Sequence, residues 1–402
     1  MRPTLTIDLS ALAANYRFFR DARPDAEIGA AVKCDAYGIG VARAAPRLFA
    51  EGCRSFFVAT MEEGAELRGV LNDAAAPEAA TAEPAAPAPA IYVLNGPGAG
   101  EAAEFLRHGL IPVLNSAAQI ARWREGGRGR PAALHVDTGM TRLGLRADEA
   151  QAMAAADGFA GLDIALLMTH LACADEADHP MNAAQAAAFD RVAALFPRAR
   201  RSFGASAGGL LFSASWPARS PSHPPAGRRD RAVGRGSGPA MAERKSELLR
   251  IGIGLYGGGP SGAPDPRLRP AATAEAEILQ LRAARAGETV GYGATRRLAR
   301  DSTLAVLNVG YGDGYLRSGS GRGEVFFPKA GGLAPVAGRI SMDLTAVDVT
   351  DLLSGGAVLR EGDRAELFGP NLPLDIAASA AQTISYELLT ALGRRYRRIY
   401  KD

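Results

Sequence analysis

One lysine of the sequence directly follows an apolar run that is expected to be buried. In the stretch AAVKCDAYGIG (30–40), a run of small apolar residues ends at Lys33, and a Tyr-Gly turn follows at once. We expect the run to form a buried strand with the lysine at its tip. Burial disfavours the charged form of an amine, and a neutral lysine is a nucleophile toward carbonyl carbons. The stretch therefore predicts a lysine that performs covalent chemistry.

Length and composition predict a two-domain globular protein. The chain has 402 residues, of which 47% are hydrophobic and 22% charged. A formal net charge of +3 favours neither nucleic acid nor a membrane surface as a partner. The three cysteines, Cys34, Cys53 and Cys173, have no paired spacing and indicate no disulfide framework. Because we find neither a signal-peptide pattern nor an apolar run long enough to span a bilayer, we expect a cytoplasmic protein.

Eight short apolar runs alternate with helical patterns in the first part of the chain. Strands covered by helices on both faces read as near-continuous apolar runs, so this alternation favours a parallel sheet. Eight such units in about 230 residues fit one (β/α)8 barrel, with an open doubly wound sheet as the alternative. The predicted strands are Glu27–Lys33, Arg54–Ala59, Ile91–Leu94, Leu110–Leu114, Ala132–Val136, Asp163–His170, Arg201–Ser206 and Leu249–Leu255. The predicted helices are Met61–Arg68, Gly100–His108, Ser116–Arg124, Ala147–Ala156 and Asn182–Ala194.

The pattern changes after Gly259. Val and Leu alternate with polar residues in stretches such as GEVFFP and MDLTAVDVT, which predicts a mostly antiparallel β domain. The first long helical pattern of this part is Asp375–Arg395, and the opening strand Thr4–Asp8 is expected to pair into the same domain. We therefore divide the chain into a barrel, 9–262, and a β domain, 1–8 and 263–402.

Two segments are predicted to be mobile insertions in the barrel, at about 73–90 and 215–244. The first is rich in Ala and Pro, the second in Pro, Gly, Ser and Arg, and neither has enough large apolar residues to offset the entropy lost on ordering. The arginines of the second segment could form an RNA-binding patch, but no aromatic residues are interleaved with them. A solvated loop is therefore the favoured interpretation.

Polar side chains follow several of the predicted barrel strands. Because the working residues of a (β/α)8 barrel lie at the carboxyl ends of its strands, these residues should share one face with Lys33. Arg142 follows the fifth strand, His170 and Ser206 end the sixth and seventh, and Arg250 lies in the eighth. Alone, a strand-end arginine is usually a surface ion pair, and a lone histidine is usually a core residue. Together they predict a basic, polar ring around the candidate nucleophile.

Two local patterns could be mistaken for other sites. The stretch GIGLYG (252–257) matches the dinucleotide fingerprint G-x-G-x-x-G, but a loop follows it where that motif requires a helix. Its backbone N–H groups still suit an isolated phosphate. The stretch 173–179 contains Cys, Asp, Glu and His, but without the paired spacing of a zinc site, so we predict no metal.

Many ordered motifs resemble those of the alanine racemases. VKCDAYGIG is similar to the motif that carries the cofactor lysine of that family. Further blocks that resemble the family are EEGAELR (62–68), VDTGMTRLG (136–144), MTHLACADE (168–176), RIGIGLYG (250–257), VGYGAT (290–295), VGYGDGY (309–315), GRISMDL (338–344) and TISYE (383–387). The resemblance spans nearly the whole chain. It implies a barrel plus a β domain, pyridoxal 5′-phosphate as cofactor, and racemisation of alanine, which supplies D-alanine for peptidoglycan.

The resemblance also implies roles for individual residues. Lys33 would bind the cofactor covalently and act as the base on the D-alanine face, and Tyr292 would be the base on the L-alanine face. His170 and Arg250 would tune Tyr292, and Arg250 would also donate to the pyridine nitrogen. The implied phosphate-binding residues are Tyr37, Ser206, Gly252, Ile253 and Tyr386, and the implied substrate-binding residues are Arg142, Met342 and Tyr311.

The resemblance also implies how the chain assembles, and one position of the sequence departs from the family. Tyr292 and Met342 are far from Lys33 in the chain; by resemblance they reach the barrel of a second protomer, which implies a homodimer with shared sites. His135 stands where many family members have a lysine, often carbamylated, that positions the arginine matching Arg142. A neutral imidazole cannot supply that negative charge, so how Arg142 is positioned stays open.

Three other functions share parts of this pattern. A broad-specificity amino-acid racemase of the same fold is the nearest, because the sequence does not give the width of the pocket around Tyr311 and Met342. A non-catalytic protein that binds the same cofactor would lack a β domain with a tyrosine base, so Tyr292 argues against it. A decarboxylase of this fold would be expected to place an acid at the pyridine nitrogen, so Arg250 argues against that activity.

Overall fold

The computed structural model describes residues 2–75, 88–211 and 247–402. Most of the predicted insertion at 73–90 and all of that at 215–244 lie outside these ranges, so the expectation that they are mobile stays a prediction. Among the described residues, no helix combines the length and apolar character that crossing a membrane requires.

Eight parallel strands close into a barrel in the N-terminal part of the chain. They are β2 (Ala26–Ala31), β3 (Ser55–Val58), β4 (Ala90–Val93), β5 (Ile111–Leu114), β6 (Pro131–Asp137), β8 (Asp163–Met168), β9 (Arg200–Ser202) and β10 (Glu247–Ile251). Each strand pairs with its neighbours in this order, and β10 pairs with β2 to complete the ring. The short β7 (Leu145–Arg146) pairs with β6 alone. The closed barrel is confirmed, and the open doubly wound sheet is excluded.

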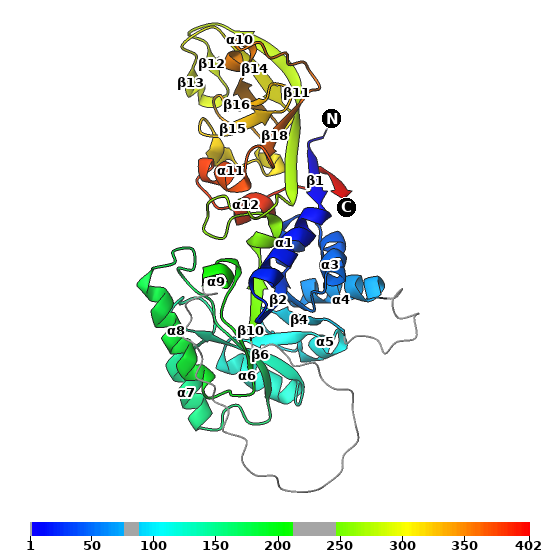
Figure 1. The fold of residues 1–402 in the computed structure, drawn as a ribbon, viewed down its shortest axis with the longest axis vertical. Coiled ribbons are helices and arrows are strands. Elements are labelled where there is room, and N and C mark those ends of the chain that lie inside the picture. The colour runs from blue at the N-terminus through cyan, green and yellow to red at the C-terminus, as the bar shows by residue number, and fades with distance from the viewer. Residues whose placement is uncertain (1, 76–87, 212–246) are drawn as a thin grey trace.

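Helices surround the barrel and supply its outer layer (Figure 1). They are α1 (Leu9–Ala22), α3 (Val41–Ala50), α4 (Met61–Ala75), α5 (Ala102–Arg107), α6 (Ala117–Gly126), α7 (Ala147–Ala155), α8 (Pro180–Ala193) and α9 (Ser206–Leu211). Side-chain caps mark several starts: Asp8 accepts from the N–H of Ala11 before α1, and Ser116 from that of Gln119 before α6. Large side chains such as Phe56, Phe57 and Trp123 are fully buried.

Several predicted strands end earlier than expected. The predicted strand Asp163–His170 stops at Met168, Arg201–Ser206 stops at Ser202, and Leu249–Leu255 stops at Ile251. After Ile251 the backbone enters the 3₁₀ turn η2 (Ile253–Tyr256). His170 therefore lies in the loop beyond β8 and Ser206 at the start of α9, both on the carboxyl face of the barrel, whereas Arg250 lies within β10.

The C-terminal part is a mostly antiparallel β domain, as predicted. Its main sheet has the order β16-β15-β18-β11-β1-β19, and β11 also pairs with β14, which pairs with β17. The strands are β1 (Thr4–Asp8), β11 (Ala272–Ala284), β12 (Thr289–Val290), β13 (Arg296–Arg297), β14 (Ser302–Leu307), β15 (Glu324–Phe327), β16 (Gly332–Pro335), β17 (Thr345–Asp348), β18 (Arg364–Phe368) and β19 (Arg397–Lys401). As expected, β1 joins this sheet, antiparallel to β11 and parallel to β19.

The single long helix expected over Asp375–Arg395 is wrong. The chain instead forms two short helices, α11 (Leu374–Ala380) and α12 (Ser385–Thr390), and the small α10 (Thr350–Ser354) precedes them. Gln382 interrupts the pattern with a left-handed φ of 56°, a conformation that cannot continue a right-handed helix. The interruption turns α12 toward the barrel, where it reaches the cavity described below.

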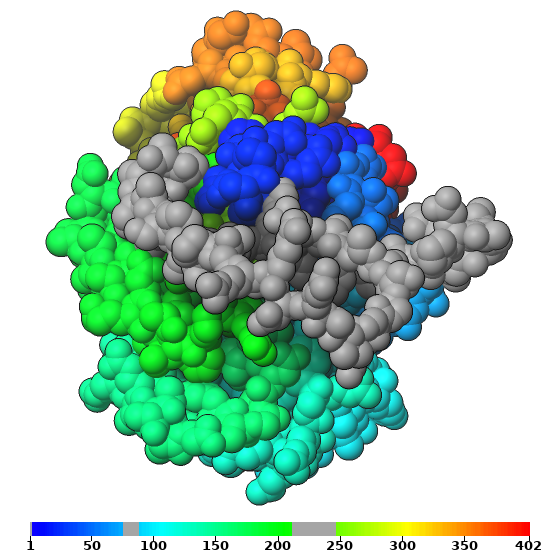
Figure 2. Space-filling view, turned by 60° about the horizontal axis from the view of Figure 1, so that its bottom comes forward, coloured from blue at the N-terminus to red at the C-terminus, as the bar shows by residue number. Residues whose placement is uncertain are grey.

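Helix α1 lies at the junction of the two domains. In Figure 2 the N-terminal residues, in blue, lie between the C-terminal domain, in yellow and orange, and the rest of the barrel, in green and cyan. Buried Asn15 of α1 donates to the carbonyl oxygens of Leu255 (3.0 Å) and Arg269 (2.8 Å) and accepts from the N–H of Arg269 (2.8 Å). One side chain thus fixes the connection between the domains to the first barrel helix.

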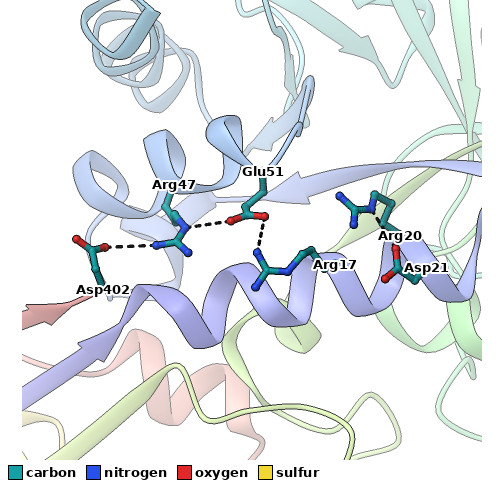
Figure 3. Close-up of polar contacts among 6 residues, drawn as sticks. All are labelled: Arg17, Arg20, Asp21, Arg47, Glu51 and Asp402. Carbon is teal, nitrogen blue, oxygen red and sulfur yellow. Dashed lines mark hydrogen bonds and ion pairs between the residues drawn. The ribbon is translucent and has the colours of Figure 1, made fainter.

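An ion-pair chain ties α1 and α3 to the end of the polypeptide (Figure 3). Glu51 accepts from Arg17 (2.6 Å) and Arg47 (3.2 Å), and Arg47 also contacts Asp402 (3.4 Å). These side chains are partly exposed, so we expect each pair to contribute under about 1 kcal/mol.

Replacing Asn15 by Leu should destabilise the protein far more than breaking a surface ion pair. The variant leaves the buried carbonyl oxygen of Leu255 and the part-buried N–H and carbonyl oxygen of Arg269 without these partners, which should lower the free energy of unfolding by about 2–4 kcal/mol. Arg20→Ala, which removes the exposed Arg20–Asp21 pair shown in Figure 3, is the control and should cost under about 1 kcal/mol. Denaturant unfolding measures both, and equal losses would contradict the role of Asn15.

Candidate active site

A cavity of about 790 Å³ opens at the carboxyl ends of the barrel strands. It gathers residues from loops that follow most of these strands, together with residues of α12. Of the residues singled out from the sequence, those that line it are Lys33, Tyr37, His135, Arg142, His170, Ser206, Arg250, Gly252 and Tyr386. The strand-end argument had placed five of these on one face, Lys33, Arg142, His170, Ser206 and Arg250, which are up to 217 positions apart in the chain (250 − 33). Tyr37, Gly252 and Tyr386 were named through the family resemblance.

Lys33 begins a turn of unusual hand. The turn α2 (Lys33–Tyr37) follows β2, and its residues Cys34, Asp35, Ala36 and Tyr37 have φ angles of 54°, 54°, 52° and 54°. For L-residues other than glycine, this left-handed conformation costs about 1–2 kcal/mol per residue. The turn reverses the chain immediately after the strand and leaves Lys33 at the cavity. Lys33 is half-buried, so the expectation of a buried amine is wrong: the mouth of the barrel admits solvent.

Tyr37, at the end of this turn, is held by two other tyrosines. Its ring stacks on that of Tyr256, with the centroids 4.5 Å apart, and is tilted against that of Tyr386, at 5.9 Å. Burial raises the pKa of the Tyr37 hydroxyl above its usual range. The group is therefore neutral and can donate a hydrogen bond into the cavity.

A small polar cradle lies beside Tyr37, at the end of the eighth barrel strand. The Ser206 hydroxyl accepts from the N–H of Gly252 (3.0 Å) and of Gly254 (3.3 Å). A Cβ at Gly252 would clash with the Tyr37 hydroxyl, so glycine is needed for this close approach. Backbone N–H groups and two hydroxyls that converge in this way fit a phosphate monoester. Ile253 is buried in η2, and its side chain is not part of the cavity wall.

Arg250 is a buried cation surrounded by neutral partners. It donates to the carbonyl oxygens of Ser202 (2.8 Å) and Thr169 (2.6 Å) and to the hydroxyl of Ser202 (2.5 Å). Burial lowers the pKa of its guanidinium to about 10, so it still carries its charge at neutral pH. The cation therefore acts on the polar groups around it with little screening by water.

The contact between Arg250 and His170 defines the state of the imidazole. The Nη2 of Arg250 lies 3.3 Å from Nδ1 of His170, and a guanidinium can donate but not accept. Nδ1 is therefore the acceptor, which leaves the proton of the neutral ring on Nε2. Burial, and secondly the charge of Arg250, lower the pKa of His170 to about 3. His170 thus presents a neutral N–H donor at its other nitrogen.

His135 is also neutral, with the opposite tautomer. The amide nitrogen of Asn115 donates to the carbonyl oxygens of Leu94 (3.0 Å) and Val113 (2.8 Å). Its oxygen must therefore accept, at 2.8 Å, from Nδ1–H of His135. Burial and the charge of Arg250 lower the pKa of His135 to about 4. His135 keeps an unprotonated Nε2 in the cavity that exposed Arg142 also lines, so residue 135 supplies no negative charge there.

Three of the predicted site residues lie elsewhere. Tyr292, Tyr311 and Met342 are on the C-terminal domain, with exposed fractions of 70%, 41% and 54%, and they do not line the cavity of their own chain. The loops of Tyr311 and Met342 are joined, because the N–H of Gly312 donates to the Met342 carbonyl at 2.9 Å. Arg395 also bonds the Met342 carbonyl (3.3 Å) and pairs with buried Asp313 at 2.7 Å. The two residues therefore form one rigid, exposed edge.

The sequence reasoning missed Asn95, which lines the cavity, and three residues that hold cavity side chains, Asn115, Thr169 and Ser202. Asn95 and Asn115 follow β4 and β5, so the rule that placed His170 and Ser206 at strand ends could have found them. Thr169 and Ser202 hold Arg250 through contacts of the folded barrel that no local pattern indicates. No group of His, Cys, Asp and Glu in the described ranges has an arrangement that could hold a metal ion.

The fold and the cavity define a barrel enzyme with a lysine at the end of its first strand and a phosphate cradle at the end of its eighth. Comparison with known proteins agrees with this class. The family model "Alanine racemase, N-terminal domain" matches residues 7–219, and "Alanine racemase, C-terminal domain" matches residues 271–400. The chain belongs to the alanine racemase family.

Individual relatives match over the full length. The chain is 43% identical to an alanine racemase of Acidiphilium cryptum, covering 100% of this chain and 99% of that protein. It is 42% identical to a biosynthetic alanine racemase of Agrobacterium fabrum, covering 98% and 93%. Among solved structures, alanine racemase from Bartonella henselae with covalently bound pyridoxal phosphate superposes with a TM-score of 0.83 at 35% identity, covering 100% of both chains.

Both cavity histidines should resist protonation. In the folded protein their pKa values are lowered to about 4 for His135 and about 3 for His170, against 6.5 as the ordinary value. Between about pH 6.5 and the lowered pKa values, the unfolded chain therefore binds more protons than the folded chain. The contribution of both residues to stability should fall as the pH falls from about 6.5 through about 4 for His135 and about 3 for His170. Imidazole ¹⁵N shifts should show both rings neutral at pH 5.5, and the denatured chain is the control. A ring half-protonated near pH 6.5 would contradict the buried, cation-facing geometry.

Proposed function

We propose that the chain interconverts L-alanine and D-alanine by moving one proton between the two faces of the substrate Cα. The observation that carries this proposal is the cavity itself, where Lys33 faces a phosphate cradle and a buried arginine. The matches over the whole chain to alanine racemases support the same reaction. The biosynthetic relative is 42% identical and a catabolic one from the same organism 37%, which supports a role in D-alanine supply for peptidoglycan. We place this reaction in the cytoplasm.

The cofactor is pyridoxal 5′-phosphate, and the residues of the cavity fit it. When bound, it withdraws electrons from the amino-acid Cα and makes the Cα proton acidic. Ser206, the N–H of Gly252 and the hydroxyls of Tyr37 and Tyr386 would hold the phosphate, with the N–H of Ile253 also assigned to it. Lys33 would provide the covalent attachment. Arg250 would face the pyridine nitrogen, toward which a guanidinium can only donate.

Racemisation needs a proton acceptor on each face of the Cα, and two residues are assigned to this work. We assign Lys33 to one face and Tyr292 to the other. A free tyrosine titrates near pH ~10, so its phenolate needs stabilisation. His170 is suited to give it: its Nδ1 accepts from Arg250, and its Nε2–H is left to donate to the Tyr292 oxygen. The buried charge of Arg250 strengthens that donor through the ring.

Tyr292 can serve this cavity if it comes from a second copy of the chain. It is 70% exposed and lies on the C-terminal domain, as do Tyr311 and Met342. Ile384, at the mouth of the cavity, is 61% exposed. Exposed large apolar groups at both places suit an interface in which each C-terminal domain covers the other protomer's barrel. We therefore infer a homodimer with two shared sites.

The substrate end of the site would combine both protomers. Arg142 is exposed in the cavity and suited to bind the substrate carboxylate, with the backbone N–H of Met342 from the other copy as the second donor. Tyr311 would line the entrance beside it. A narrow entrance would favour alanine, and a wider one would admit larger amino acids, as in a broad-specificity racemase.

Borohydride reduction should fix the cofactor on Lys33. The purified protein should be yellow, and reduction should leave a secondary amine that peptide mass spectrometry places on Lys33. Lys33→Ala should remove both the label and the racemisation of alanine. Racemisation assays with alanine, serine, lysine and arginine are run in parallel on the parent enzyme and on the variant. Lys329, an exposed lysine of the C-terminal domain paired with Asp363, is the control, and Lys329→Ala should keep label and activity. Label on a different lysine would refute the assignment.

Mixing two inactive variants should restore activity if the sites are shared. Lys33→Ala and Tyr292→Phe should each lower turnover by at least about a hundredfold, as expected for loss of a catalytic acid–base group. In a randomly reassorted 1:1 mixture, half of the dimers are mixed and one of their two sites is intact, so about a quarter of wild-type activity should return. Re-equilibration through mild denaturant is required. Mixtures that stay inactive would contradict sites built from two protomers.

A further inference from the structure

The start of helix α4 carries a motif whose purpose the proposed reaction does not explain. Thr60 and Glu63 form a capping box: the N–H of Glu63 donates to Thr60 Oγ1 (3.3 Å), and the N–H of Thr60 donates to Glu63 Oε2 (3.4 Å). The same oxygen accepts a shorter bond, 2.7 Å, from the N–H of Ala59. A capping box needs one carboxylate oxygen, so the other is free for a second partner.

The second oxygen of Glu63 binds the turn of Lys33. Its Oε1 accepts from the N–H of Cys34 at 2.7 Å, although the two residues are 29 positions apart. Cys34 is the first of the four left-handed residues and follows Lys33 directly. One carboxylate thus joins the loop after β3 to the loop after β2, at the point where the lysine enters the cavity.

The left-handed turn needs such restraint, because strained backbone persists only where its surroundings fix it. Within the turn, the side chain of Asp35 accepts from the N–H of Val41 (2.7 Å). Just after the turn, Arg398 donates to the Gly38 carbonyl (3.2 Å) and Tyr400 to the Ile39 carbonyl (2.9 Å). At its near end, the side chain that restrains it is Glu63. A bond from an N–H to a carboxylate is charge-assisted and stronger than one between neutral groups.

We propose that Glu63 is a positioning residue that holds the left-handed turn and so sets the place of the Lys33 amine at the cofactor. The inference rests on the proposed function, because it takes Lys33 as the cofactor lysine. Glu63 is not among the residues that line the cavity, and it acts through the backbone of Cys34. A carboxylate has two acceptor oxygens, so Glu63 can accept from the N–H of Cys34 after β2 and from that of Ala59 after β3. An amide side chain offers one acceptor oxygen.

Glu63→Ala should loosen the turn and weaken the hold on the cofactor. Hydrogen exchange of the amides in 33–38, followed in the full chain with and without pyridoxal phosphate, should quicken about tenfold, and the cofactor should dissociate about tenfold faster. Glu63→Gln should lie between the parent and the alanine variant. Exchange in the cofactor-free protein is a readout that does not depend on activity.

Two control variants separate this role from simple helix capping. Thr60→Val breaks the capping box but keeps the contact with Cys34, so α4 should fray while exchange in 33–38 stays at the parent rate. Glu66→Gln removes a similar charge from an exposed position of α4 and should change neither readout. If Thr60→Val quickens exchange in 33–38 as much as Glu63→Ala does, or if Glu63→Ala leaves it unchanged, the proposal is overturned.

The outcome also distinguishes this proposal from the proposed function. Faster exchange in 33–38 together with borohydride label on a different lysine would leave the turn dependent on Glu63 but defeat its role at the cofactor and the function on which it rests. Label on Lys33 with unchanged exchange in Glu63→Ala would keep the function and defeat the role of Glu63.

Discussion

The burial of the Arg250 guanidinium is the interaction on which the electrostatics of the cavity depend. Withdrawing a cation from water is unfavourable by several kcal/mol unless its donors are satisfied. Here the donors go to carbonyl and hydroxyl oxygens of Ser202 and Thr169, on the neighbouring barrel strand and in the loop after β8. Because these partners are neutral, the charge is solvated but not cancelled. Burial is the larger cause of the lowered pKa values of both cavity histidines, and the charge of Arg250 adds to it, so both rings are neutral. The contact with Arg250 also assigns the tautomer of His170.

Much of this arrangement follows from sequence patterns, because a parallel barrel imposes a simple rule. Apolar runs of strand length predicted all eight barrel strands, and residues just after them had to converge on one face. The same rule was not applied to Asn95 and Asn115, which it would have found. Strand ends were misplaced by two to four residues where apolar residues continue beyond the last ladder bond, as at Leu249–Leu255. The motifs that resemble a known family supplied the assigned roles, which no periodicity contains.

Other features depend on contacts that no local pattern encodes. The left-handed turn from Cys34 to Tyr37 has one glycine after it, Gly38, and none within it, so nothing in its composition marks the strain. The turn is held from outside, by Glu63 and by residues near the end of the chain such as Arg398. The helix expected over Asp375–Arg395 failed for a related reason. The helical pattern runs through Gln382, whose left-handed backbone divides the segment into α11 and α12.

The two-domain architecture explains why a second copy of the chain is proposed for the site. The C-terminal sheet includes β1 from the beginning of the chain, and α1 follows β1 without a linker. Asn15 then fixes the connection at Arg269, and the pairs of Arg17 and Arg47 with Glu51 bind α1 to α3. A domain anchored at the start and in the middle of one barrel helix is poorly placed to swing toward its own barrel. This anchoring leaves Tyr292 exposed and away from the cavity of its own chain. The proposed acceptor on the second face of the Cα is therefore best supplied by the Tyr292 of another protomer, whose C-terminal domain is anchored to its own barrel in the same way.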